Sequence, residues 1–200
     1  MTFSSSKEFT YIKGFAMGAN MMDTVKTLNY ARQMHSTQMR KSGEPYIVHP
    51  LTMACHALSM GIKDDVIVAS LLAHDICEDC GVTINDLPCT EETKKIVDLV
   101  TKNKKMTTEE YYQRVATDIR AIIVKLIDRC HNVSSMAGVF SEAKLQEYID
   151  ETRDYVMPLI RIAKDNYPEY SNILFILKYH IGSVTDAIDL ILKSKEKSKE

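Results

Sequence analysis

Residues 71–81 read LLAHDICEDCG and join an apolar run to a group of ionisable side chains. Burying a carboxylate without a partner costs several kcal/mol or forces it to take up a proton. Residues three and four apart share one face of a helix, so His74 lies near Glu78, and Asp75 lies near Glu78 and Asp79. Carboxylates this close acquire raised pKa values or share a bound cation. The sequence favours a cation, because His and Asp are good ligands for divalent transition metals.

Two other segments offer ligands for the same cation. The segment VKLIDRCHN (124–132) places Asp128 among aliphatic residues and Asn132 on the same helical face, four positions later. His49 precedes Pro50 at the predicted start of a helix, where a side chain can point into a cavity. Two imidazoles and two carboxylates nearly neutralise a divalent ion. This mixed nitrogen and oxygen set favours manganese, iron or another six-coordinate metal over a tetrahedral zinc site.

Each of these residues also has a purely structural interpretation. A single buried His more often forms a hydrogen bond in the core than it binds a metal, and Asp128 could pair with Arg129 or Lys125. A His-Asp doublet, an Asp in apolar surroundings and a His at a helix start are together harder to explain by packing. The residues by themselves leave both interpretations open.

Apolar residues recur with helical periodicity along nearly the whole chain. Thr107 and Glu110 have the spacing of a capping box, and Pro158 should kink the long helix that Ser141 begins. We expect a single all-α domain over residues 20–193, after an N-terminal segment (1–19) and before a charged, flexible tail (194–200). The helices are expected over residues 20–40, 50–61, 63–78, 90–101, 107–115, 118–136, from 141 past 158, 168–181 and 182–193.

Charge and composition exclude several classes of protein. The 200 residues carry a formal net charge of −2, without the basic excess of a general nucleic-acid or membrane-surface binder. No apolar stretch approaches the roughly 20 residues of a membrane span. The opening MTFSSSKEFTYIKGF lacks the apolar segment of a signal peptide. We therefore expect a cytoplasmic protein without a nucleic-acid or membrane partner; the sequence does not indicate its oligomeric state.

The five cysteines do not form a recognisable framework. Cys77 and Cys80 make a CxxC pair, but no second Cys or His pair follows at zinc-site spacing, and the βαβ context of a thioredoxin motif is missing. An odd number of cysteines in helical segments suits a reducing cytosol better than disulfide bonding. We expect them to pack within helices.

Three motifs resemble those of the HD-domain metal phosphohydrolases. They are RKSGEPYIVHP (40–50), HDICEDCG (74–81) and VKLIDRCHN (124–132), and a fourth segment, ETRDYVMPL (151–159), resembles the family's region beyond the metal helix. More narrowly, the chain resembles the hydrolase domain of the RelA/SpoT family, which removes pyrophosphate from the 3′ position of the guanosine alarmones ppGpp and pppGpp. Its length resembles that of the stand-alone small alarmone hydrolases.

The resemblance implies an all-helical HD-domain fold with a metal site between helices and Mn²⁺ as the cofactor. It implies that Glu78 and Asp79 are the catalytic acidic pair. The residues that match the family's metal ligands are His49, His74, Asp75 and Asp128. Those that match its substrate contacts are Arg40, Lys41, Ser42, Asn132 and Ser135.

The chain departs from the family pattern at three positions. HSTQMRK (35–41) lacks the glycine of the usual His-x-Gly-Gln, Cys80 replaces a Thr, and Ser134 replaces a frequent Arg. Two other functions stay open beside alarmone hydrolysis. One is removal of a single phosphate from another nucleotide such as NADPH, and the other is nucleotide binding without cleavage, against which the acidic pair argues.

Overall fold

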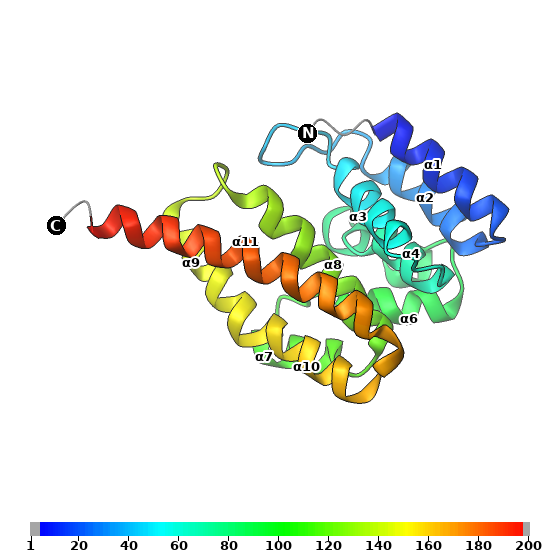
Figure 1. The fold of residues 1–200 in the computed structure, drawn as a ribbon. Coiled ribbons are helices and arrows are strands. Elements are labelled where there is room, and N and C mark those ends of the chain that lie inside the picture. The colour runs from blue at the N-terminus through cyan, green and yellow to red at the C-terminus, as the bar shows by residue number, and fades with distance from the viewer. Residues whose placement is uncertain (1–4, 198–200) are drawn as a thin grey trace. The chain divides into compact units, whose positions relative to one another are not determined.

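The computed structural model describes residues 5–197, and these residues fold into helices (Figure 1). Within that range the only strand-like pairing is an isolated bridge between Met39 and Pro45. The predicted all-α fold is therefore confirmed. No helix within residues 5–197 combines the length and the apolar character that a membrane crossing requires.

The described chain forms two compact units, one up to Ile127 and the other from Asp128 onward, so that the boundary falls inside helix α8 (Ile119–Met136). The other elements of the first unit are α1 (Ser5–Gly18), α2 (Met22–Met34), α3 (Val48–Ser59), α4 (Asp65–Ala73), α5 (Ile76–Asp79), η1 (Ile84–Asp86), α6 (Glu91–Val100) and α7 (Thr108–Val115). Those of the second are α9 (Glu142–Glu151), η2 (Thr152–Val156), α10 (Met157–Asn166), η3 (Pro168–Tyr170) and α11 (Ser171–Lys197). The domain boundaries after residues 19 and 193 stay predictions.

Helix α4 forms the centre of the first unit. Its residues from Val66 to Ala73 are all buried, and the helix packs against α2, α3 and α6 (Figure 1). A helix that is apolar all round is stable only where other elements cover every face. Asp64 begins the helix, because its Oδ1 accepts a hydrogen bond from the Ile67 amide at 3.2 Å. The residues that follow Ala73 therefore emerge from the interior of the unit.

Two aspartates join α2, α4 and α6. The amides of Asp23 and Thr24 donate to Asp65 at 3.0 and 2.8 Å, which satisfies the first turn of α2. Asp23 Oδ2 in turn accepts hydrogen bonds from the Thr90 amide at 2.9 Å and from the Thr93 hydroxyl at 2.7 Å. These bonds fix the three helices against one another by their ends as well as by their apolar faces.

The second unit has its own core, in which α9 and α10 pack along α11 (Figure 1). A π-helical turn, η2, links α9 to α10, and Pro158 lies in the first turn of α10 directly after it. Pro158 has no amide hydrogen to donate to the preceding turn, and the wider π-helical turn accommodates the proline without a broken α-helical hydrogen bond. One buried cluster of this core comprises Val133, Met136, Leu145, Ile149, Ile188 and Leu192.

The long helix α11 replaces the two helices predicted over residues 168–181 and 182–193, so this prediction is wrong. Gly182 does not end a helix. A Cβ atom there would lie 3.5 Å from Met157 Cε, an ordinary van der Waals distance, and α11 continues through this position. Residues 194–197 of the predicted tail continue the helix, and residues 198–200 lie outside the described residues.

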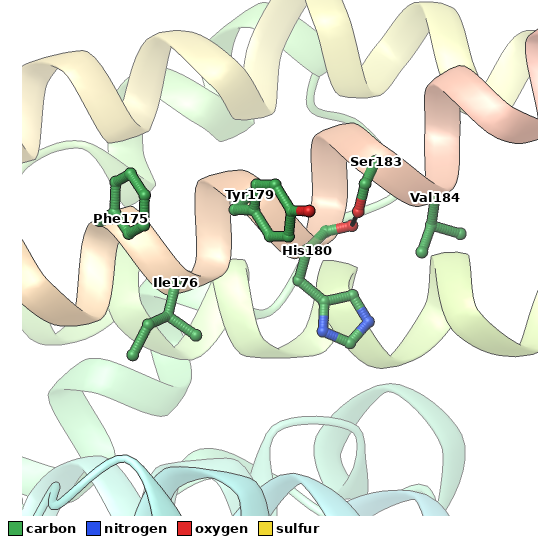
Figure 2. A pocket seen from close by; sticks show the side chains of 6 residues that line it. All are labelled: Phe175, Ile176, Tyr179, His180, Ser183 and Val184. Carbon is green, nitrogen blue, oxygen red and sulfur yellow. Dashed lines mark hydrogen bonds between the residues drawn. The ribbon is translucent and has the colours of Figure 1, made fainter.

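Helix α11 also carries a shallow apolar pocket of about 330 Å³. In Figure 2 the side chains of Ile176, His180 and Val184, spaced four residues apart, project from the same side of the helix. The Ser134 hydroxyl lies 2.9 Å from His180 Nε2. None of the residues that line this pocket is among the predicted site residues.

Helix α1 was not expected from the sequence, and a buried carboxylate explains why. Ile12 and Ala16 lie on its buried face four residues apart, but the preceding position of that stripe is Glu8, which is only 9% exposed. Glu8 Oε1 accepts a hydrogen bond from the Thr52 hydroxyl at 3.0 Å, whereas Oε2 has no partner within the described residues. Burial therefore raises the pKa of Glu8 above its ordinary value of 4.5.

Replacing Glu8 with Gln should stabilise the fold at neutral pH. The raised pKa means that Glu8 binds a proton more tightly in the folded state than in the unfolded state. Protonated Glu8 therefore adds to the free energy of unfolding at any pH below its unfolded pKa. This addition is lost as the pH rises through the pKa of the folded state. Gln removes this loss and retains an oxygen for Thr52. We expect E8Q to raise Tm by about 2–4 °C at pH 7, the shift for about 1 kcal/mol in a chain of this size, and by much less at pH 4.

Thermal unfolding of wild type and E8Q at both pH values measures this difference. Glu169→Gln, at an exposed position, is the matched control and should leave Tm unchanged. An E8Q variant with an equal or lower Tm at pH 7 would contradict the assignment of a destabilising buried carboxylate.

Candidate metal centre

The helix predicted over residues 63–78 is divided in the structure at the residues that matter most. Helix α4 ends at Ala73, His74 and Asp75 form a turn, and the one-turn helix α5 begins at Ile76. The prediction of a continuous helix is therefore wrong, although both turn residues keep near-helical dihedral angles. The two side chains therefore lie directly at the C-terminal end of the buried helix α4.

Two imidazoles and a carboxylate converge at this turn. His49 lies in the first turn of α3, which Pro50 helps to begin, and its Nε2 is 3.2 Å from His74 Nε2. Asp75 Oδ2 lies 2.8 Å from His74 Nε2 and 3.6 Å from His49 Nε2. Both rings are buried, whereas the Asp75 side chain is partly exposed. The first unit alone thus brings together three of the four predicted ligand residues.

A hydrogen bond to the backbone determines which ring nitrogen of His74 faces this cluster as an acceptor. His74 Nδ1 lies 2.9 Å from the Leu71 carbonyl oxygen, which can only accept, so Nδ1 carries the proton. In the neutral ring with its proton on Nδ1, the Nε2 lone pair points toward the Asp75 carboxylate, the orientation that a metal ligand needs. Histidines that bind metals usually donate their other N–H in this way, which leaves Nε2 and the carboxylate to share a cation. The cluster fits a divalent metal ion.

Tyr46 orients the carboxylate, and sequence reasoning missed it. Its hydroxyl donates a hydrogen bond to Asp75 Oδ2, and its ring packs against those of His49 and His35, with centroids 5.9 and 4.7 Å away. The only sequence signal is its place in the motif EPYIVHP, three residues before His49. A tyrosine that binds a ligating carboxylate fixes its orientation toward the ion.

Glu78 and Asp79 lie on α5, one turn beyond the cluster, and both are exposed. Glu78 Oε1 accepts a hydrogen bond from the Lys102 amide at 2.6 Å, and Asp79 Oδ2 accepts one from Gln38 Nε2 at 2.9 Å. Loss of hydration beside the surrounding protein raises the pKa of Glu78, and the Asp75 charge adds to this effect. The two carboxylates thus follow the proposed ligands closely along the chain, and each accepts a hydrogen bond from a residue outside the metal cluster.

The predicted substrate residues Arg40, Lys41 and Ser42 lie on a tight turn between α2 and α3. The Arg40 amide donates to the Glu44 carbonyl at 2.8 Å, and the Gly43 amide donates to the Arg40 carbonyl at 2.9 Å. Gly43 has a φ of 85°, in the region that favours glycine. Arg40 is half-buried, whereas Lys41 and Ser42 are exposed.

Thr37 stands where the family motif has a glycine, and this replacement does not strain the backbone. Within the described residues the only non-glycine residue with positive φ is Asn20, so Thr37 occupies an ordinary backbone conformation. The departure from the family pattern therefore leaves the path of the turn intact.

The remaining predicted residues lie on the part of α8 that belongs to the second unit. Asp128 is buried, and its Oδ1 accepts a hydrogen bond from Asn132 Nδ2 at 2.6 Å. The Ser135 hydroxyl donates to the His131 and Asn132 carbonyls at 3.1 and 3.3 Å. The spacing of four predicted that Asp128 and Asn132 share a face, and this is confirmed. Coordination of one ion by Asp128 together with the two histidines stays a prediction.

Arg129, next to Asp128, is fixed by the fourth motif. Its guanidinium lies 3.9 Å from the centre of the Tyr148 ring, donates to the Thr152 hydroxyl at 3.1 Å and pairs with Glu151. Arg129 is only 1% exposed, so these partners satisfy a buried charge. The motif ETRDYVMPL therefore anchors α8 one residue from the predicted ligand.

The cysteines behave as packing residues. All five are free, and burial raises the pKa of Cys77 to about 11. A thiol with such a pKa is not a ready nucleophile or metal ligand at neutral pH. Cys80 Sγ lies 3.8 Å from the Met34 carbonyl, where the thiol can donate a weak hydrogen bond.

Comparison with known proteins agrees with this geometry. Residues 27–116 match the family model described as HD domain. The chain is 38% identical over 143 residues to a probable guanosine-3′,5′-bis(diphosphate) 3′-pyrophosphohydrolase of Synechocystis, covering 65% of this chain and 19% of the relative. It is 35% identical over 144 residues to the Aquifex aeolicus protein of that name, covering 67% and 20%. The chain spans about a fifth of the length of these relatives.

A solved structure shares the fold. That protein, described as "A metazoan ortholog of SpoT hydrolyzes ppGpp and plays a role in starvation responses", superimposes with a TM-score of 0.54 at 22% identity, covering 72% of this chain and 96% of that one. The predicted resemblance to HD-domain hydrolases of the RelA/SpoT type is confirmed. Residues 27–116, which match the HD-domain model, contain His49, His74 and Asp75.

Proposed function

We propose that this protein is a manganese-dependent hydrolase that removes the 3′-pyrophosphate of ppGpp and pppGpp, giving GDP or GTP and pyrophosphate. The observation that carries the proposal is the convergence of His49 Nε2, His74 Nε2 and Asp75 Oδ2 within 3.6 Å of one another. The names of the relatives from Synechocystis and Aquifex aeolicus support the choice of substrate. Cytoplasmic location and the lack of a nucleic-acid partner stay predictions.

The proposed ligands of the ion are His49, His74, Asp75 and Asp128. The hydrogen bonds from Tyr46 to Asp75 and from Asn132 to Asp128 would orient the two carboxylates. The mixed nitrogen and oxygen set favours manganese over a closed zinc site. When bound, a divalent ion supplies Lewis acidity that lowers the pKa of water toward about 7.

The acidic pair would manage the protons of the reaction. Water adds to the phosphorus bonded to the ribose 3′ oxygen, and that oxygen leaves with the bonding electrons and takes up a proton as pyrophosphate departs. Glu78 and Asp79 follow the ligand Asp75 by three and four residues, close enough along the chain for one to take a proton from water and the other to deliver one. The raised pKa of Glu78 suits a group that must exchange protons near neutral pH.

The turn before α3 would hold the nucleotide. The planar guanidinium of Arg40 can stack on guanine, and Lys41 offers a compact charge for phosphate. The Ser42 hydroxyl lies 3.5 Å from Glu44 Oε2, at the edge of hydrogen-bonding distance, and so is exchangeable for a substrate contact. Asn132 and Ser135 are the proposed contacts from α8.

Product analysis tests the function. Purified protein incubated with ppGpp should release pyrophosphate and GDP in the presence of Mn²⁺ and neither product after chelation. Release of orthophosphate from a 2′- or 3′-monophosphorylated nucleotide, with ppGpp left intact, would identify a different phosphohydrolase. Tight binding of ppGpp without turnover at any Mn²⁺ concentration would identify a binding module.

Removing either acid should separate metal binding from turnover. Glu78→Ala and Asp79→Ala retain all four proposed ligands, so Mn²⁺ affinity measured by calorimetry should stay within about twofold of wild type, since neither side chain is proposed to ligate. Turnover of ppGpp should fall by about 10²–10⁴, the typical value of general acid–base catalysis. Glu109→Ala, at an exposed position on α7, is the matched control. Near-wild-type turnover in both variants would end this assignment of roles.

A further inference from the structure

We propose that Gln38 is a positioning residue that holds the Asp79 carboxylate in place, and that buried His35 in turn holds Gln38. This inference rests on the proposed function, in which Asp79 exchanges a proton during hydrolysis. Neither residue is among the predicted ligands, catalytic residues or substrate contacts, although the position of His35 beside the first motif suggests an orienting or packing role. Both lie in the segment that follows α2, about 40 residues before Asp79 in the sequence.

The Gln38 side chain bridges the two groups. Its Nε2 donates a hydrogen bond to Asp79 Oδ2 at 2.9 Å, and its Oε1 lies 2.6 Å from His35 Nδ1. The bridge therefore connects the C-terminal end of α2 to α5. Its backbone is also held, because the Tyr46 amide donates to the Gln38 carbonyl at 2.9 Å.

Hydrogen-bond chemistry fixes the direction of this bridge. An ionised carboxylate can only accept, so the amide must present its nitrogen to Asp79 and its oxygen to His35. The oxygen also only accepts, so His35 Nδ1 must carry a proton. The chain of donors thus runs from His35 through Gln38 to Asp79 and has one consistent arrangement.

His35 is a firm anchor for the bridge. It is 2% exposed, its amide donates to the Ala31 carbonyl at 3.0 Å, and its ring lies 4.7 Å from that of Tyr46. Burial lowers the pKa of His35, which favours the neutral ring, and the contact with the Gln38 oxygen places a proton on Nδ1. Cys80 Sγ lies 3.7 Å from the same nitrogen and adds packing from the end of α5.

Asp79 needs such an anchor because its own element constrains it little. It is the last residue of a four-residue helix and its side chain is exposed, so its rotamer is not fixed by burial. An isolated helical turn is weakly stable, and a displacement of about 1 Å in a reacting group can lower a rate by about 10²-fold. A fixed donor on Oδ2 would keep the carboxylate at one position and leave its other oxygen for the proton.

A double-mutant cycle tests this role. Gln38→Leu preserves size but removes both hydrogen bonds, and it should lower kcat for ppGpp by about 10–100-fold while KM and Mn²⁺ affinity change by less than about twofold. If Gln38 acts through Asp79, Gln38→Leu should cause no further loss of kcat in the Asp79→Ala background. Losses that multiply in the double variant, or a rise in KM without a fall in kcat, would overturn the proposal.

Two further variants separate positioning from general stability. Gln38→Glu retains an oxygen toward His35 but places a second oxygen against Asp79, so kcat should fall at least as much as in Gln38→Leu. A merely structural bond to His35 would instead leave kcat of this variant near wild type. Gln113→Leu, in which an exposed glutamine also loses a hydrogen bond to a carboxylate, is the matched control and should not change kcat.

NMR of the side chains gives a readout that does not depend on activity. In wild-type protein the two Gln38 amide protons should be resolved and slow to exchange, and the His35 ring should show a protonated Nδ1. Asp79→Ala should speed exchange of the Gln38 amide, and an unaltered exchange rate would overturn the proposal. Absence of pyrophosphate release by the wild-type protein would instead count against the proposed function, whatever the NMR result.

Discussion

The hydrogen bond from His74 Nδ1 to the Leu71 carbonyl fixes the orientation of the ring that faces the site. Nε2 of the buried ring then faces the Asp75 carboxylate at 2.8 Å and His49 Nε2 at 3.2 Å. A divalent cation can be coordinated by the lone pairs of both rings and by the carboxylate at once. The end of α4 before His74, the burial of α4 and the position of His49 in the first turn of α3 together create this arrangement.

Around the cluster, a second set of bonds arranges the groups that do not ligate. Tyr46 binds Asp75, Gln38 binds Asp79, and the Lys102 amide binds Glu78. Two of these donors come from the loop between α2 and α3, which also carries Arg40 and Lys41. One short segment thus orients a proposed ligand, orients a proposed proton carrier and presents the cationic side chains proposed for the nucleotide.

Much of this could be predicted from local sequence because the signals are local. The Thr107 and Glu110 capping box forms as expected, and the Ser141 side chain accepts a hydrogen bond from the Lys144 amide. The doublet of His74 and Asp75 in an apolar run identified the cluster because buried charges need partners.

What could not be predicted depends on tertiary contacts. Neither the end of α4 at Ala73 nor the continuation of α11 through Gly182 follows from helix propensity. Glu8 interrupts the apolar face of α1, so the sequence does not show the periodicity of a helix there. Asp79, the hydrogen-bond partner of Gln38, lies 41 residues further along the chain. No periodicity in the sequence encodes such pairs.

Pulsed EPR of the Mn²⁺-loaded protein, with histidine labelled by ¹⁵N, tests the central claim most directly. The account predicts one bound Mn²⁺ per chain whose spectrum shows coupling to two histidine nitrogens, one of which disappears in His49→Ala. Mn²⁺ that binds without histidine coupling, or a spectrum unchanged by that substitution, would contradict a shared ion between His49 and His74.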